Sequence, residues 1–363
     1  MTESRMMTFR GGGWVLCVMA LVCAVLIVWA VAPAMFVTPK PGDGRNIDTY
    51  GFDLTNLAVP RELVGTPMRT RDMVPVMDTV PGVVTAEEVQ RINEEERGKY
   101  IVSADRVVGV VINGEARAYP ISVLNVHEVI DDTLGGIPIA VTYSWLGDCV
   151  RVFDRRLPNG RVIRLGISGL VYNANTLFYD RDQPEGGLWL QFTGQAVSGS
   201  DLGLQLSIIP SQLASWAQWR EMHTETTVIT RDSAFGKRYR KASPDQYFRS
   251  PHIGLPVEPM PPDDEVLPKV KDRVLVIEAP LGSGHHRVYP LTYIAARAHD
   301  QLVDRSKHRW HWMDTVNSVN VHFEYDAIAH TAVAWADSPI GISPSLWFLW
   351  HAMKPDVPSL PAR

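Results

Sequence analysis

"RVVGVVINGEARAYP" spans residues 106–120, and "RVLVIEAPLGSGHHRVYP" spans residues 273–290. Each stretch is an apolar, β-branched strand, a Gly-containing turn and a return strand, and Asn-Gly at 113–114 is a strong hairpin signal. The return strands share three residues: Arg117, Tyr119 and Pro120 in the first, Arg287, Tyr289 and Pro290 in the second. The sequence therefore predicts two hairpins of the same design.

Two further pairs of segments recur in the same order. Residues 137–155 and 318–335 each read as two strands around a short turn. Tryptophans three residues apart share one helix face in two later segments: Trp216 and Trp219 in the first, Trp347 and Trp350 in the second. We predict an α+β fold, mainly antiparallel β, built from two degenerate copies of one α+β unit.

We call these copies the first half (47–245) and the second half (246–363). The first half is longer, mainly because of an insertion at 163–200. Two helix starts are also predicted. Thr85 and Glu88 have the spacing of a capping box for a helix over 85–96, and Ser211 is the expected cap of the first Trp helix.

The amino-terminal part differs from the rest of the chain. Residues 14–37 carry no charge, and as a helix they would extend about 36 Å, enough to cross a bilayer. The charge distribution predicts that 1–13 lies in the cytoplasm and that the part after the apolar segment lies outside it, in the periplasm or at the cell surface. Residues 38–46 are polar and rich in Pro and Gly, which predicts a linker. The alternative is a cleaved signal peptide, because Ala32-Pro33-Ala34 resembles a cleavage site.

Composition limits the classes of function. The chain has 363 residues, a formal net charge of −5 and 45% hydrophobic residues, as expected of a folded protein. It has no Lys/Arg block, which argues against nucleic acid as a partner. Of its three cysteines, Cys17 and Cys23 lie in the apolar segment, so Cys149 has no partner for an internal disulfide.

The strongest cluster of chemically active residues is His127-Glu128 followed by Asp131-Asp132. Imidazole and carboxylate together can hold a transition metal or exchange protons near neutral pH. If 121–130 is helical, His127 and Asp131 share a face, and His127, Glu128 and Asp131 become candidate metal ligands. The alternative is a helix end followed by a turn, with the acids solvated.

A long insertion in a compact unit is often functional. We therefore expect 163–200 to fold back over 127–149 and form a cleft lined by the candidate catalytic residues His127, Glu128, Asp148, Cys149 and Asp180. The second half, with Ala298-His299 near the corresponding place, is expected to lack such a cleft. Most of the eleven histidines lie in 285–330, but their spacing matches no known metal motif.

Several stretches resemble the bacterial and archaeal family called domain of unknown function 3179. They are "VVGVVINGEARAYPISVLNVHEVIDDTLGGIPIAVTY", "GISGLVYNANTLFYDRD", "LWLQFTGQAVSG" and "WAQWREMHTETTVI". The resemblance implies an exported protein and no established activity. Family members usually carry Cys-Pro-Leu-Cys after the Thr-Tyr, where this chain has Ser144-Trp145-Leu146-Gly147. Thiol-pair or metal chemistry at that segment therefore does not carry over.

These observations leave two classes of function. One is a membrane-anchored binding or assembly module with a cleft in the first half. The other is an exported metal-dependent or redox enzyme that uses His127, Glu128 and nearby acids. The missing cysteines favour the first class, and the His-Glu-Asp-Asp group favours the second.

Overall fold

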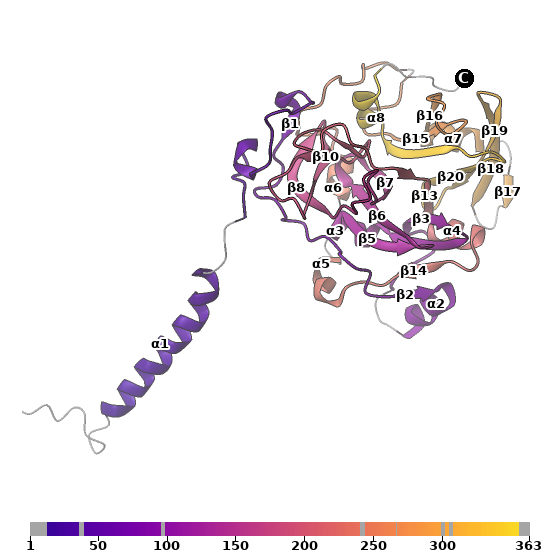
Figure 1. The fold of residues 1–363 in the computed structure, drawn as a ribbon. Helices are drawn as coiled ribbons and strands as arrows, with labels where there is room; N and C mark the ends of the chain where they lie inside the picture. The colour runs from indigo at the N-terminus through magenta and orange to yellow at the C-terminus, as the bar shows by residue number, and fades with distance from the viewer. Residues whose placement is uncertain are drawn as a thin grey trace, which may run out of the picture. The chain divides into compact units, whose positions relative to one another are not determined.

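The computed structural model describes residues 13–35, 40–95, 99–239, 244–265, 267–298, 302–304 and 308–355. Two parts are each compact, Met1–Pro41 and Gly42–Arg363. The first contains helix α1 (Gly13–Met35), labelled in Figure 1. No helix within the described ranges is long and apolar enough to span a bilayer, so the predicted transmembrane segment 14–37 is not supported.

The second part has five sheets among the described residues, and β strands predominate. Three sheets consist of first-half strands. In strand order, they are β1 (Val64–Gly65), β8 (Leu165–Tyr172), β9 (Asn175–Asp180), β10 (Leu188–Leu190) and β11 (Gln195–Ala196); β12 (Ile208–Ile209), β7 (Cys149–Asp154), β6 (Ile137–Ser144) and β5 (Val129–Leu134); and β13 (Ser211–Ser215), β3 (Arg106–Ile112), β4 (Glu115–Pro120), β14 (Thr227–Ile229) and β2 (Val83–Thr85). Two sheets consist of second-half strands, namely β16 (His286–Pro290), β15 (Arg273–Glu278) and β21 (Gly341–Leu346); and β17 (Leu302–Asp304), β18 (Arg309–Val316), β19 (Val319–Asp326) and β20 (Thr331–Trp335). The named strands pair antiparallel except β14 with β4, which confirms a mainly antiparallel α+β fold.

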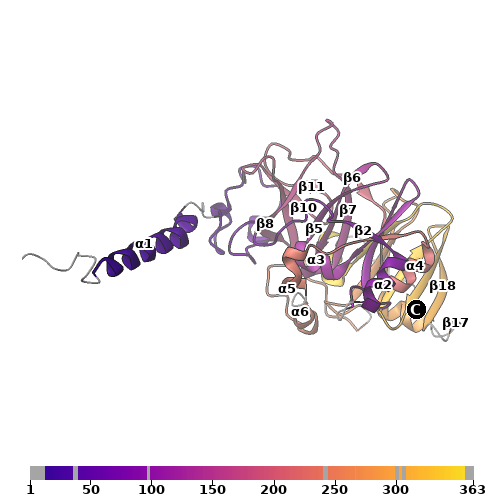
Figure 2. The ribbon, with the colours of Figure 1, turned by 90° about the horizontal axis from the view of Figure 1, so that it is seen from below.

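Short helices connect and cover these sheets. They are α2 (Ala86–Glu95), α3 (Ile121–His127), α4 (Trp216–Met222), α5 (Gly236–Tyr239), α6 (Asp245–Arg249), α7 (Leu291–Ala298) and α8 (Trp347–Met353), with 3-10 turns η2 (Ile47–Tyr50), η3 (Arg61–Leu63), η4 (Trp145–Gly147) and η5 (Ser233–Phe235). In both ribbon views α5 lies beside α3 (Figures 1 and 2).

Both predicted hairpins are present. β3 pairs with β4 through a turn in which Asn113 and Gly114 have φ of 51° and 82°, as the Asn-Gly signal predicts. β15 pairs with β16 in the second half. Each return strand is tied to the next sheet by its shared Tyr, because Tyr119 Oη donates to Asp132 at 2.7 Å and Tyr289 Oη donates to Asp314 at 2.8 Å.

The two halves share further local geometry. Arg117 pairs with Asp132, and Arg287 pairs with Asp314. The hairpins β5–β6 and β18–β19 both turn through two residues of positive φ, at 135–136 and 317–318. These contacts agree with the repeat hypothesis, which remains a prediction until the halves are superposed.

Each hairpin gains a third strand that leads into a Trp helix. β13 pairs with β3 and continues into α4, and β21 pairs with β15 and continues into α8. Gly109 of β3 lies against the Trp219 ring, since a Cβ there would meet that ring at 2.2 Å. Close packing of the Trp helix on its hairpin therefore requires glycine at this position.

One predicted helix cap is confirmed and the other is wrong. Thr85 N donates to Glu88 Oε2 at 2.8 Å and Glu88 N donates to Thr85 Oγ1 at 3.2 Å, which is the expected capping box. Ser211 is not a cap, because residues 211–215 pair with β3 as a strand. Ser215, at the end of that strand, caps α4 with Gln218 as its partner.

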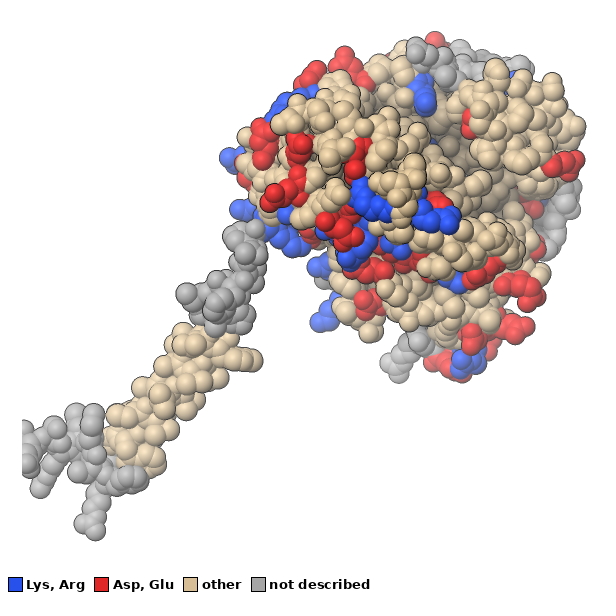
Figure 3. Space-filling view, viewed as in Figure 1, with Lys and Arg blue, Asp and Glu red and all other residues tan. Residues whose placement is uncertain are grey.

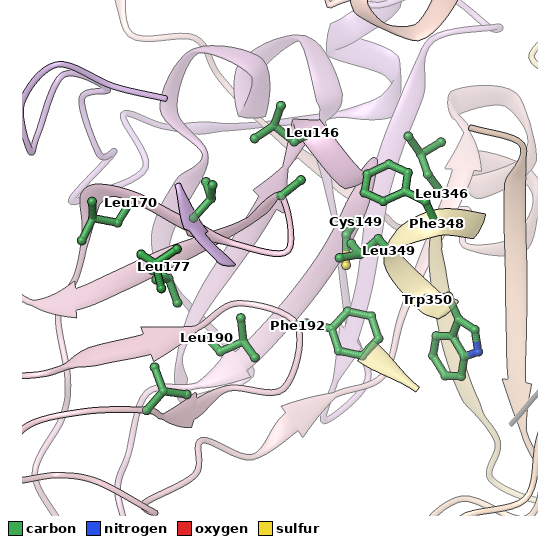
Figure 4. Close-up of a cluster of buried hydrophobic side chains, with 14 of the residues drawn as sticks. Leu146, Cys149, Leu170, Leu177, Leu190, Phe192, Leu346, Phe348, Leu349 and Trp350 are labelled. Carbon is green, nitrogen blue, oxygen red and sulfur yellow. The ribbon is translucent and has the colours of Figure 1, made fainter. Parts of the chain in front are cut away.

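The halves also share a hydrophobic core. One cluster combines first-half residues such as Leu146, Cys149 and Phe192 with Leu349 and Trp350 of α8. Figure 4 shows α8 directing its side chains toward Cys149 and Phe192. Packing of this kind joins the halves as one structure.

Candidate functional site

His127 is a packed residue at the end of α3. Its Nδ1 lies 2.8 Å from Pro75 O, and its Nε2 lies 2.7 Å from Tyr239 Oη. The Phe235 ring meets the imidazole edge-on, and burial lowers the pKa of His127. Both ring nitrogens therefore have protein partners and the ring favours its neutral form.

The predicted helix over 121–130 is wrong at its end. α3 stops at His127, Glu128 adopts φ of 55°, and Asp131 lies on strand β5. His127 and Asp131 therefore do not share a helix face. Within the described residues, no group of three or more His, Cys, Asp or Glu side chains is arranged to hold a metal ion.

Glu128 and Asp131 are both buried, but in different surroundings. Glu128 receives a 3.3 Å hydrogen bond from Thr176 Oγ1 of β9, so the insertion does reach this residue. Burial raises the pKa of Glu128 to about 7. Asp131 pairs with Arg155 at 2.9 Å, and burial raises its pKa to about 7 although Arg155 opposes the shift.

Cys149 and Asp180 have separate roles in packing. Cys149 is fully buried, and burial raises the pKa of its thiol, which makes it a poor nucleophile. Asp180 forms an ion pair with Arg161. These contacts satisfy each residue locally.

Asp148 joins three elements of the fold. Both of its carboxylate oxygens accept from Arg106 Nη1, at 2.9 and 2.8 Å, and Oδ1 also accepts from Tyr143 Oη at 2.7 Å. Arg273 Nε of the second half donates to Oδ2 at 2.6 Å. Burial alone would raise the pKa of Asp148, but the guanidinium groups of Arg106 and Arg273 outweigh it and hold that pKa well below its usual range.

His330 takes the place of Asp148 in the second half. β6 and β7 meet at Ser144 and Cys149, and Asp148 precedes that Cys with φ of 45°. β19 and β20 meet at Asp326 and Thr331, and His330 precedes that Thr with φ of 51°.

The neighbours of these two residues also correspond. Tyr143 and Tyr325 each lie five residues earlier and bond to Asp148 and His330, at 2.7 and 3.0 Å. Arg106 and Arg273 begin β3 and β15, opposite Ser215 and Leu346.

Arg106, Asp148, Arg273 and His330 meet at a small cavity, which we call the inner cavity, of about 20 Å³. It is lined by Arg106, Asp148, Leu213, Arg273, Val274, Leu291, His330, Thr331, Ala332, Pro344 and Ser345. Ser345 Oγ is buried and has no hydrogen-bond partner among the described residues. The inner cavity therefore contains an unsatisfied hydroxyl beside two guanidinium groups.

A larger space adjoins the inner cavity, and we call it the second-half cleft. Its volume is about 330 Å³. It is lined by Phe248, Lys271, Asp272, Arg273, Leu291, Thr292, Ala295, Tyr325, His330 and Leu346. Arg273, Leu291 and His330 line both spaces, so the inner cavity and this cleft adjoin at these three residues.

These two spaces differ in their lining from the first-half cleft that the sequence predicts, and that cleft stays a prediction. Neither space is lined by His127, Glu128, Cys149 or Asp180, and the larger one is lined wholly by second-half residues. Only Asp148 of the predicted catalytic set reaches either space. His299, named for the corresponding place, lies outside the described residues.

The histidines of 285–330 do not form one site in the described chain. His311 and His322 stack at 5.3 Å on the sheet β18–β19–β20, beside Trp335. His286 lies against Trp350, and His330 lines the cleft.

A sequence signal for the cleft residues did exist. Asp105-Arg106-Val107 recurs as Asp272-Arg273-Val274, immediately before the two hairpins. The equal spacing from Tyr143 to Asp148 and from Tyr325 to His330 marks the second pair of positions. Aligning the halves on these landmarks matches Arg273 with Arg106 and His330 with Asp148.

The fold and site define a mainly antiparallel α+β protein in which the two halves share a hydrophobic core and Arg273 and His330 line a cleft. A family model described as "Protein of unknown function (DUF3179)" matches residues 71–357, and the chain belongs to that family. The match includes both hairpins, Asp148 and the second-half cleft. No curated protein and no solved structure matches.

Where the family's Cys-Pro-Leu-Cys is expected, the chain has a strand end and a 3-10 turn. Ser144 Oγ accepts from Thr176 N at 3.1 Å, so this position is tied to the insertion. A Cβ on Gly147 would meet Leu349 of α8 at 2.2 Å. In this chain the segment therefore serves packing.

Proposed function

We propose that this protein is a binding module that holds a small molecule in the second-half cleft. The observation that carries the proposal is the cleft itself, which has a volume of about 330 Å³ and has Arg273 and His330 in its lining. Small-molecule sites commonly have volumes of about 300–1,000 Å³, with apolar walls and a few fixed polar groups.

The lining of the cleft has this mixed character. Phe248, Leu291 and Leu346 supply apolar surface. Lys271 is held in place, because its Nζ donates to Tyr247 O at 2.8 Å and to His252 O at 2.7 Å. A fixed ammonium group on an apolar wall orients a ligand at little further entropic cost.

The enzyme alternative based on His127 and Glu128 lacks comparable support. The nitrogens of His127 are both bonded to protein groups, and Glu128 is buried under the insertion. That reading stays a prediction from the sequence.

The proposal includes an extracytoplasmic location and the absence of nucleic acid as a partner. The location rests on the apolar start of the sequence and on the setting typical of the family. Acidic and basic side chains are interspersed on the face of the second part seen in Figure 3, which supports the second expectation.

Ligand-induced stabilisation tests the proposal. Compounds from a small-molecule library that raise the unfolding temperature of the protein are re-measured on Thr292→Trp, which fills the cleft from an exposed position of α7. Ala296→Trp is the matched control, because residue 296 is exposed on the same helix and does not line the cleft.

We expect Thr292→Trp to abolish the stabilisation and Ala296→Trp to keep it. If no compound has an effect that depends on residue 292, the proposed function is wrong.

A further inference from the structure

The two halves differ in charge at the residues that meet around the inner cavity. In the first half, Arg106 has a carboxylate from its own half, Asp148, which also accepts from Tyr143. In the second half, Arg273 and Tyr325 occupy the matching positions, but His330 stands where the carboxylate would be. Arg273 therefore has no acid at the position where Arg106 has one.

Asp148 supplies only part of the negative charge that Arg273 lacks from its own half. It pairs with both Arg106 and Arg273, so one carboxylate faces two guanidinium groups. The single hydrogen bond of Arg273 to Asp148 uses Nε–H, which leaves the four N–H donors of the two Nη atoms for another acceptor. Arg273 is the guanidinium that lines the second-half cleft.

The nearest other acid has a separate role. Asp272 accepts from Lys269 N at 2.9 Å, as Asp105 accepts from Val102 N at 2.8 Å in the first half. Because the same contact occurs in both halves, it belongs to the loop that begins each hairpin. Asp272 lies in the cleft wall beside Lys271, which carries the opposite charge.

The inner cavity supplies both a donor and a size limit. Ser345 Oγ is buried and has no partner in the described chain. A volume of about 20 Å³ accepts one water-sized group. A planar carboxylate can place one oxygen there and present the other to the guanidinium, whereas a tetrahedral oxyanion needs more room at the same end.

We propose that the ligand of the second-half cleft carries a carboxylate, which pairs with Arg273 and takes the place that Asp148 has in the first half. This inference rests on the proposed function. The acid group binds at the inner end, between Arg273, His330 and Ser345. The rest of the ligand lies along Phe248 and Leu291.

A substitution that introduces a carboxylate at residue 330 tests this inference. His330→Asp places an acid at the position equivalent to Asp148, and His330→Asn is the uncharged control of the same shape. Asp148 itself has φ of 45°, and Asp and Asn are the residues that best tolerate such backbone. Both variants are therefore compatible with the turn at 330.

The probe is benzoate, whose ring fits an apolar wall, with benzamide as its neutral analogue and phenylphosphonate as a tetrahedral anion. Isothermal titration calorimetry on the full chain is expected to detect benzoate and neither analogue. His330→Asp should weaken benzoate binding by about tenfold or more, the factor that one lost charge-assisted pair gives, and should raise the unfolding temperature. His330→Asn should bind benzoate within about threefold of the wild type, since the guanidinium remains open.

Four outcomes of these titrations overturn the inference: no benzoate binding by the wild type, equal binding of benzamide, tighter binding of phenylphosphonate, or equal loss in the Asp and Asn variants. A neutral compound whose stabilisation is lost in Thr292→Trp would also refute the carboxylate, but would keep the cleft as a binding site. The proposed function itself fails only if no compound has a stabilising effect that depends on residue 292.

Discussion

The turn at 145–148 and the turn at 327–330 have the same design and different chemistry. In each, a Tyr bonds to the residue five positions later, and that residue has positive φ. The first turn ends in Asp148, whose carboxylate is bonded to Tyr143, Arg106 and Arg273. The second ends in His330, which lines an open cleft. Turns of similar local geometry thus carry an ion-pair cluster in one half and line a cleft in the other.

The cleft described in the second half is not the cleft that the sequence predicts in the first half. The first half has the His-Glu pair and the long insertion, and it was expected to hold the cleft. In the structure those residues are buried and bonded to protein groups, and the cleft is lined by the second half. The buried polar residues His127 and Glu128 therefore make packing contacts, and their residue types alone do not identify a functional site.

The largest test of the comparison is removal of the Asp148 carboxylate. Asp148→Ala leaves Arg106 and Arg273 without their shared partner in a buried site. Loss of one partner of a buried ion pair typically costs about 3–5 kcal/mol of unfolding free energy. Urea unfolding of this variant beside His330→Ala measures the difference, because His330 holds no such pair. Equal losses in the two variants would show that the turns do not differ as described.

A smaller effect is expected from Glu128, the other buried acid of the first half. Its pKa rises from 4.5 in the unfolded chain to about 7 in the folded protein, because burial penalises the charged form. The stability that this acid contributes is fully present below pH 4.5 and is lost as the pH rises through about 7. The loss amounts to about 3 kcal/mol at 1.36 kcal/mol per pKa unit.

Glu128→Gln should remove that part of the pH dependence. Urea unfolding at several pH values between 4.5 and 8 provides the measurement, with Glu95→Gln on the exposed end of α2 as the control. A wild-type stability that rises across this range, or a variant with an unchanged profile, would contradict a protonated Glu128.

The smallest expected effect separates the two tyrosines. Tyr143→Phe removes a hydrogen bond to an ionised carboxylate, which is worth about 1.5–3 kcal/mol, whereas Tyr325→Phe removes a bond to His330, worth about 0.5–1.5 kcal/mol. Thermal or urea unfolding of both variants gives the order. If Tyr325→Phe lowers the unfolding free energy more than Tyr143→Phe, then the bond to His330 stabilises the fold more than the bond to Asp148, which contradicts the comparison.

Local features of the fold were predictable because short-range chemistry fixes them. Asn113-Gly114 prefers the positive φ of a tight hairpin turn, and Thr85 with Glu88 forms a capping box from four consecutive residues. Where strand pairing competed with local preference, the prediction failed. The sequence predicts Ser211 as a helix cap, but pairing with β3 keeps it in a strand, and Ser215 caps the helix.

The sequence alone thus determined the hairpins, the antiparallel α+β class and the family, since turn chemistry, alternating strands and ordered motifs are all written locally along the chain. Tertiary structure decided the site. Arg106, Asp148, Arg273 and His330 come from four separate places in the sequence and meet only because the halves pack on one another. At the two turns, Asp148 accepts from Arg106 and Arg273, whereas His330 lines the second-half cleft beside Arg273.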